Sequence, residues 1–273
     1  MKKIISIFFL ISILFFPQDI FSTPSVNPLR IHFIDVGYGD AILIEFPDAS
    51  TMMIDAAEAH YADNVLAYLQ SLNIQRIDTA IITHPHVNHF EGFSLIVEHM
   101  PIGRVLINGD ANTEEGYEEL LEVFNKKSIA VKKIVRGDLL DQLPLDIIIK
   151  ILHPKELDES VNNNSIVLKL SYKNKSILFM GDVEINAQEK LFEEFADLTD
   201  VDYVKVPHHG GPLSEQFIQK FKNTDFIIST GPNEWGLPDD NALSRLSGKI
   251  LRTDTLGTII LQSDGEAIEH VIP

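Results

Sequence analysis

The sequence predicts a single α/β (α+β) domain built as a four-layer αββα sandwich of two mixed β-sheets. Strand-like and helix-like stretches alternate along the 273 residues, and no Gly/Ser/Pro-rich linker divides them. The two halves repeat the same β/α pattern, so each supplies helices that can cover one face of a sheet. The composition, 45% hydrophobic and 23% charged, is that of a globular protein. Two independent domains are the alternative arrangement.

The first half predicts a three-strand meander followed by alternating helices and strands. Period-two alternation between turn residues marks strands, and apolar residues at helical spacing mark helices. The predicted strands are 29–37, 40–47, 51–56, 76–84, 104–109 and 129–135, and the predicted helices are 61–72, 88–100 and 112–126.

The second half continues in the same style and closes with a hairpin. Asp264-Gly265 is typical of its turn. The predicted strands are 145–154, 165–172, 175–181, 201–209 and 225–230, the hairpin covers 259–272, and the predicted helices are 184–195 and 214–221.

The N-terminus is typical of a secretory signal. Lys2 and Lys3 precede a largely apolar stretch at 4–16, and a polar segment with small residues follows. That stretch is too short for a comfortable membrane span. We therefore expect a signal peptide over 1–22, one domain over 23–273, a secreted or periplasmic location, and no stable membrane insertion after cleavage. An uncleaved anchor is the alternative.

Two properties of the composition limit the chemistry. The chain has no cysteine, so disulfides and thiolate metal sites are excluded, and any zinc must be held by imidazole and carboxylate groups. The formal net charge of −18 repels nucleic acid at long range, so a polyanionic substrate is disfavoured.

Candidate metal ligands follow four of the predicted strands. Strand ends at one edge of a sheet are where functional sites collect. The segment "THPHVNH" alone places three histidines within six positions. The residues in question are Asp55, His84, His86, His89, Asp182, His208 and His209.

The spacing of the triple-histidine segment suits a metal. His84 and His86 are two residues apart, so they point to the same side of an extended backbone, and Pro85 disfavours helix at His84. His89 lies in the first helical turn and can fold back over the same point. Imidazole is the commonest zinc ligand, and the cluster can hold one ion or two about 3.5 to 4 Å apart.

The order of the motifs resembles the metallo-β-lactamase fold, most closely the soluble hydrolase domain of ComEC-type DNA-uptake proteins. The segments that carry the resemblance are "HFIDVGYGDAILIEFPD", "MMIDA", "THPHVNHFEG", "NNNSIVLKLSYKNKSILFMGDVE" and "VDYVKVPHHGG". Together they span most of residues 30 to 263.

The resemblance implies a role for each site residue. His84 and His86, with Asp182, look like ligands of a first Zn²⁺. His89, Asp182 and a histidine of the 208–209 pair look like ligands of a second. His208 is preferred and His209 is the other choice. Mn²⁺ is an alternative metal.

The remaining roles concern residues beside the metals. Asp55 looks like a carboxylate that orients a ligand. Asp182 fixes the metal pair, and His209 can protonate the leaving oxygen. Asn162 and Ser165 fall where other branches of the fold place a further histidine.

The sequence departs from the family pattern at several positions. Asn88 stands where the signature has Asp, a residue that binds the second metal and helps to hold the attacking water. Asn offers a carbonyl oxygen without charge, so we expect a weaker second site. Leu237, Gly211 and Tyr38 replace the His, Ser and Gln usual in this branch.

These features favour a secreted metal-dependent hydrolase that cleaves a phosphodiester or related ester with a zinc-activated hydroxide. A small-molecule or surface-attached substrate fits the acidic charge. One alternative is an extracellular nuclease related to DNA uptake. This would need a basic track, for which the candidates are Lys169, Lys173, Lys175 and Lys205. The other is a catalytically impaired binding protein, because of Asn88.

Overall fold

The computed structural model describes residues 27–111, 114–195 and 198–272. The expected signal peptide over 1–22 lies outside these ranges. In the described parts of the chain, no helix is long and apolar enough to cross a membrane.

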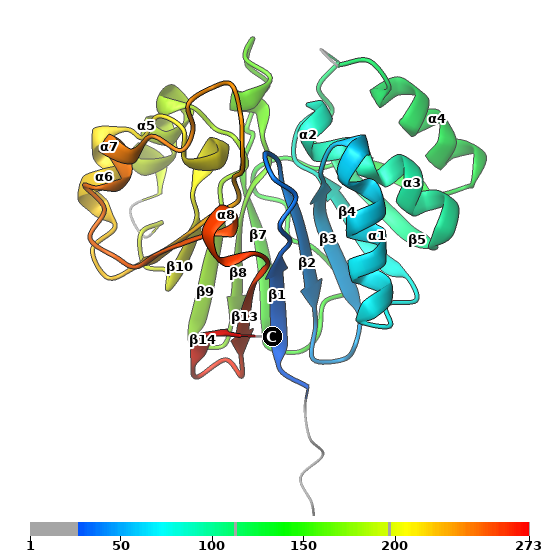
Figure 1. Ribbon diagram of the computed structural model, residues 1–273, viewed down its shortest axis with the longest axis horizontal. Coiled ribbons are helices and arrows are strands. Elements are labelled where there is room, and N and C mark those ends of the chain that lie inside the picture. Colours follow the sequence, from blue (N-terminus) through cyan, green and yellow to red (C-terminus); the bar gives the residue numbers. More distant parts are fainter. Residues whose placement is uncertain (1–26, 112–113, 196–197, 273) are drawn as a thin grey trace, which may run out of the picture.

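Two mixed β-sheets face each other at the centre of the molecule (Figure 1). The eight-stranded sheet has the order β14-β13-β1-β2-β3-β4-β5-β6 and the six-stranded sheet has the order β12-β11-β10-β9-β8-β7. The first comprises β1 (Leu29–Phe33), β2 (Ala41–Glu45), β3 (Thr51–Ala56), β4 (Ile77–Ile82), β5 (Ile102–Ile107), β6 (Ala130–Lys133), β13 (Ile259–Ser263) and β14 (Ile268–Val271). The second comprises β7 (Ile147–His153), β8 (Val167–Tyr172), β9 (Lys175–Phe179), β10 (Tyr203–Lys205), β11 (Asp225–Ile228) and β12 (Ile250–Arg252).

Helices cover the outer face of each sheet, which confirms the four-layer αββα prediction (Figure 1). Those on the eight-stranded sheet are α1 (Ala62–Ser71), α2 (Val87–Phe90), α3 (Gly92–His99) and α4 (Tyr117–Lys126). Those on the six-stranded sheet are α5 (Ile185–Glu194), α6 (Glu215–Lys220) and α7 (Asp240–Leu243), and α8 (Thr253–Leu256) follows β12. Three short 3₁₀ turns are η1 (Ala59–Tyr61), η2 (Asn162–Asn164) and η3 (Pro207–Gly210).

Three apolar cores hold these layers together. Phe33 and Phe179 stack between the two sheets, with ring centroids 6.0 Å apart. Phe93 lies in the core between the eight-stranded sheet and its helices, and Phe217 lies in the core on the other side. All four side chains are buried. The interior of the sandwich is therefore apolar along most of its length, and its polar groups gather at one end.

In both sheets, the carboxyl ends of the parallel strands lie at this polar end of the sandwich. β3, β4 and β5 are mutually parallel neighbours, as are β9, β10 and β11. The carboxyl ends of parallel strands lie at one edge of their sheet. The candidate ligands lie at the end of β3 and in the segments that follow β4, β9 and β10, so the topology brings them to a common place.

The structure differs from the predicted elements in three respects. The predicted strand over 201–209 is shorter, because β10 ends at Lys205 and the left-handed backbones of His208 and His209 form the turn η3. The predicted helix over 88–100 is divided into α2 and α3 at Glu91, because the amide of Gly92 donates to the carbonyl of Ala57 at 3.0 Å instead of continuing the helical ladder. The short elements α7, β12 and α8 were not predicted, since each has only three or four residues and leaves little periodicity to detect.

Candidate metal centre

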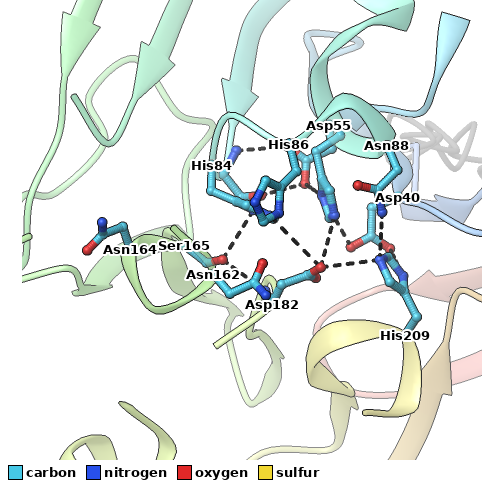
Figure 2. Close-up of polar contacts among 12 residues, drawn as sticks. Asp40, Asp55, His84, His86, Asn88, Asn162, Asn164, Ser165, Asp182 and His209 are labelled. Carbon is cyan, nitrogen blue, oxygen red and sulfur yellow. Dashed lines mark hydrogen bonds and ion pairs between the residues drawn. The ribbon is translucent and has the colours of Figure 1, made fainter. Parts of the chain in front are cut away.

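Most of the predicted site residues meet in one buried cluster at the carboxyl ends of the strands (Figure 2). Asp55 is the last but one residue of β3, and His84 follows β4. His89 lies in α2 and Asp182 follows β9. His209 lies in η3, after β10. Segments from both sheets thus supply the cluster.

Asp55 joins the end of β3 to the segment after β4. Its backbone has φ 57°, a left-handed conformation that Asp tolerates better than most residues. The carboxylate accepts hydrogen bonds from the Thr83 amide at 2.8 Å and the Thr83 hydroxyl at 2.7 Å, and it contacts His89 Nδ1 at 2.8 Å. Asp55 therefore fixes the His89 ring with Nε2 facing the centre of the cluster, as expected of an orienting carboxylate.

His84 and His86 point to the same side, as their spacing predicts. His84 Nε2 lies 3.0 Å from His86 Nδ1 and 3.9 Å from Asp182 Oδ2. The other nitrogen of His84 lies 3.2 Å from the hydroxyl of Ser165, which also accepts from the Asp182 amide at 2.9 Å. Ser165 thus holds His84 and Asp182 at a fixed separation.

Asp182 lies at the centre of the cluster. Its Oδ2 is 3.1 Å from His89 Nε2 and 3.2 Å from His209 Nε2, and the carboxylate is buried. His84, His89 and Asp182 each offer one ligand atom, and these atoms lie within 4.8 Å of one another. The position predicted to bridge two metals is the one on which the imidazoles converge.

The two histidines after β10 occupy different environments. Both have left-handed backbones, with φ 51° at His208 and 55° at His209. The His209 ring is buried, and its Nδ1 contacts the Ser229 carbonyl at 3.0 Å, which leaves Nε2 for Asp182. The His208 ring lies farther out, with its centroid 6.2 Å from that of His209. The geometry therefore favours His209 as the ligand, the second choice from sequence.

Asn88 faces His209 across the cluster. Its side-chain nitrogen is 3.0 Å from His209 Nε2, the ring atom that also contacts Asp182. In the neutral tautomer whose Nδ1 donates to the Ser229 carbonyl, the Asn88 amide can donate to Nε2. An Asp at this position could not donate that hydrogen bond while ionised.

Two further charged residues of the site were not found from sequence. Asp40, at the start of the predicted strand over 40–47, is buried and lies 3.9 Å from His89 Nδ1 and 4.0 Å from His209 Nδ1. Lys205, the last residue of β10, is buried against Asp40 and lies 3.9 Å from Asp182 Oδ1. The sequence offered Lys205 only as a candidate for a basic track, because periodicity does not reveal a partner that is distant in sequence.

The cluster shifts the pKa values of its members in opposite directions. Burial disfavours charge on every histidine here, but Asp182 and Asp55 outweigh it at His89 and raise its pKa to about 10. At His84, burial and the neighbouring His89 hold the pKa well below 6.5. At Asp182, burial opposes ionisation, but His209 and His89 outweigh it and hold the carboxyl pKa well below its usual value. The site thus combines a neutral imidazole with an ionised carboxylate at neutral pH.

This donor set fits a divalent metal ion. Imidazole nitrogens and carboxylate oxygens are the ligands that Zn²⁺ and Mn²⁺ accept. Asp182 Oδ1 is buried and has no hydrogen-bond partner among the described residues. Such an atom is costly unless something binds it. The convergence of these groups is therefore explained by a cation.

Comparison with known proteins supports this interpretation. The family model described as "Metallo-beta-lactamase superfamily" matches residues 34–242. ComE operon protein 3 of Bacillus subtilis (strain 168) is 28% identical over 254 residues, which cover 84% of this chain and 32% of that protein. The uncharacterized protein YcaI of Escherichia coli (strain K12) is 23% identical, over 81% of this chain and 28% of that protein. The chain thus spans about a third or less of these curated relatives.

Solved structures show the same fold at low sequence identity. A metal-dependent hydrolase of the beta-lactamase superfamily has a TM-score of 0.57 at 14% identity and covers 84% of this chain and 98% of its own. CmlA, a diiron beta-hydroxylase from Streptomyces venezuelae, has a TM-score of 0.52 at 16% identity, over 88% and 55%. Because a hydrolase and a hydroxylase share it, the fold alone leaves the reaction open.

Proposed function

Because the chain belongs to the metallo-β-lactamase superfamily, we propose that it is a secreted metal-dependent hydrolase that cleaves phosphodiester or related ester bonds. The single observation that carries the proposal is the convergence of His84, His89 and His209 on the one buried carboxylate of Asp182. Structural histidines are usually satisfied by separate partners. Here ring nitrogens of several histidines face a shared point, which is the arrangement that a metal site needs.

We assign the ligands as follows. His84, His86 and Asp182 would hold a first ion, and His89, Asp182 and His209 would hold a second, with His208 as the alternative to His209. When bound, such an ion supplies Lewis acidity and lowers the pKa of a coordinated water. Zn²⁺ is the expected metal, and Mn²⁺ is the alternative.

The protein's own side chains hold the metal ligands in position and supply a proton to the leaving oxygen. Asp55 orients His89, and Ser165 holds His84 and Asp182 at a fixed separation. His209, with Nδ1 fixed by the Ser229 carbonyl, presents Nε2 toward the reacting centre. The Tyr38 ring packs on His209 at 4.4 Å between centroids and covers that side of the site. These contacts fix the cluster before a substrate binds, and such pre-organisation is usually the largest contribution to an enzyme's rate enhancement.

The charge of the chain favours a small or surface-attached substrate. With a net charge of −18, the protein repels a long polyanion, whereas a single phosphodiester carries one charge that a bound cation can offset. The apolar N-terminal stretch supports an export signal and therefore an extracellular or periplasmic substrate.

A nuclease is the second candidate, because the chain resembles ComE operon protein 3. The structure offers little for DNA beside the site. Lys205 is buried inside the cluster and cannot be a surface contact. Lys173 and Lys175 flank the β8–β9 turn, at the end of β9 opposite Asp182. Lys169 contacts the Asp200 carbonyl. The nuclease proposal therefore rests on the relative alone.

A catalytically impaired binding protein is the third candidate, and Asn88 is the observation that favours it. Its hydrogen bond to His209 Nε2 occupies the atom that a second metal would need. A single weak site would bind a ligand without hydrolysing it.

One experiment separates a metal-dependent hydrolase from the binding protein. Protein corresponding to residues 23–273 is analysed for bound metal and then assayed on bis-p-nitrophenyl phosphate before and after chelation and with Zn²⁺ or Mn²⁺ restored. We expect about one tightly bound ion and hydrolysis that chelation abolishes and metal restores. Asp182→Asn should lose both metal and activity, and Asp63→Asn on the exposed side of α1 should lose neither. Hydrolysis that survives chelation would contradict the proposal, and metal binding without hydrolysis would favour the binding protein.

A further inference from the structure

The Lys205 ammonium lies inside the protein among carboxylates rather than on its surface. The side chain is 1% exposed, and β10 is paired on both sides, with β9 and β11. Lys205 Nζ is ion-paired with Asp40 Oδ2 and lies 3.9 Å from Asp182 Oδ1. Both carboxylates are buried as well, so the ammonium is the positive group that faces them. A permanent cation is thus built into the polar end of the sandwich.

The carboxylates around this ammonium have unused binding capacity. Asp40 Oδ1 and Asp182 Oδ1 are both buried and have no hydrogen-bond partner among the described residues. Asp40, Asp182 and His209 each offer a ligand atom, and the three atoms lie within 4.8 Å of one another. Two carboxylates and an imidazole are a donor set that Zn²⁺ and Mn²⁺ accept.

Asp40 is held in place independently of Lys205. Its amide donates to the Asn88 carbonyl at 3.2 Å, and its own carbonyl accepts from the Ala57 amide at 2.8 Å. The backbone of Asp40 is therefore fixed to α2 and to the end of β3. When Lys205 is replaced, the Asp40 carboxylate therefore still faces the space that the ammonium occupied.

We propose that the Lys205 ammonium fills a cation-binding position between the carboxylates of Asp40 and Asp182, beside His209, and so keeps an additional metal ion out of it. Two carboxylates side by side in the interior repel each other and need a positive partner. A lysine supplies that charge permanently, whereas a metal would have to be acquired. The consequence is that Lys205 limits the number of metal ions at this site. This inference rests on the metal binding proposed above but not on hydrolysis.

The test is a metal count on the Lys205→Met variant. Met has a similar length and no charge, so the position is vacated without a large change of volume. The variant is saturated with Zn²⁺, desalted and analysed by mass spectrometry of the metal, and Mn²⁺ binding is followed by calorimetry. We expect one more metal ion per chain than in the unaltered protein. Lys169→Met, a half-buried lysine on β8, is the matched control and should leave the count unchanged.

A second variant shows where the additional ion binds. Asp40→Asn combined with Lys205→Met removes both members of the ion pair, so the fold retains charge balance but loses a carboxylate ligand. We expect the metal count to return to that of the unaltered protein. An unchanged count in Lys205→Met, or an additional ion that persists in the double variant, would overturn the proposal.

The single variant can also fail to fold, because Asp40 loses its partner. In that case, folding that is restored only by added Zn²⁺ supports the proposal. If metal does not restore folding, the Zn²⁺ affinity of the Asp40→Asn single variant becomes the deciding measurement. Lys205 then has only Asp182 to pair with and competes with metal for it, so Zn²⁺ affinity should fall by about tenfold and recover in the double variant. Unchanged affinity in Asp40→Asn would overturn the proposal. Hydrolytic activity enters none of these measurements, so failure here is distinguishable from failure of the proposed reaction.

Discussion

Asn88 places an uncharged amide against His209 Nε2 at the position where the family signature has a carboxylate. We expect Asn88→Asp to increase the affinity for a second metal ion, because the new carboxylate adds one negative charge and stops donating a hydrogen bond to the ligand nitrogen. Calorimetric titration with Zn²⁺ measures this. A tenfold gain in affinity would correspond to about 1.4 kcal/mol. Unchanged metal content and rate would show that position 88 does not contact the metal.

In the proposed metal site, Asp55 acts through His89, whose Nδ1 it contacts at 2.8 Å. We expect Asp55→Asn to lower metal affinity by about 10- to 100-fold, because the His89 ring loses the carboxylate that fixes its orientation and raises its basicity. The measurement is metal affinity, with activity as a second readout. Asp63→Asn in the first turn of α1 is the matched control, since Asp63 is exposed and lies outside the cluster. Equal affinities in both variants would rule out the orienting role.

His89 makes the stability of the metal-free protein depend on pH. Its pKa is about 10 in the folded state against 6.5 for the unperturbed residue, so the folded state binds the additional proton between those values. This contribution is fully present below pH 6.5 and is lost as pH rises toward 10. Between pH 7 and 9 we expect the free energy of unfolding to fall, by at most about 1.4 kcal/mol per pH unit. Urea unfolding of chelated protein tests this, and a flat profile would contradict it.

The spacing of the triple-histidine segment was sufficient to predict that His84 and His86 share a side and that His89 folds back toward them. It could not distinguish His208 from His209, because adjacent residues in left-handed conformation do not follow the alternation of a strand. Asp40 and Lys205 were missed because their partners lie far away in the sequence, and a buried charge cannot be identified before its neutralising partner is known.

At the scale of elements, the junction of α3 with the end of β3 sets the position of the histidine segment. A Cβ added at Gly92 would lie 1.9 Å from the Ala56 carbonyl oxygen, so only glycine allows this approach. We expect Gly92→Ala to destabilise the fold by about 3 kcal/mol and to lower metal affinity, because the helices must move away from Asp55.

Thermal or urea unfolding together with a metal titration checks this expectation. Ser94→Ala, which lies on the same helix with an exposed side chain, should change stability by less than about 0.5 kcal/mol. If Gly92→Ala is as stable as that control, the backbone at this junction can move apart at little cost in free energy, and the prediction is wrong.

Element prediction from sequence succeeded where periodicity was long. The meander of β1, β2 and β3, the helix α1 and the closing hairpin lie where alternation or helical spacing placed them. The division of the predicted 88–100 helix could not be foreseen, because it depends on a hydrogen bond from Gly92 to Ala57, a residue in the loop after β3.

At the scale of the whole molecule, net charge distinguishes the hydrolase of small substrates from the nuclease. With a charge of −18, the protein should show no retardation of duplex DNA at about 0.15 M salt, because binding needs a run of cations along the phosphates. Gel retardation with and without Zn²⁺ measures this. Strongly salt-dependent binding would indicate a basic surface and favour the nuclease.

The layer arrangement was predictable because each half of the sequence supplies strands together with helices that cover one face. The way the halves share strands was not. The hairpin of β13 and β14, the last two strands in sequence, joins the sheet of the first half, where β13 pairs with β1. No local sequence pattern predicts which sheet edge, formed by strands far away in the sequence, a hairpin will pair with.

That pairing has a consequence for how the protein is made. As the ribosome releases the chain, β1 has its partner β2 on one side, but its other edge stays open until Ile259–Ser263 emerge. Pairing between strands so far apart in the sequence is slow, and the unpaired edge of β1 stays exposed during synthesis and can pair with other chains. A chain whose first sheet waits for so distant a strand therefore stays open to mispairing for longer than one built from neighbouring strands.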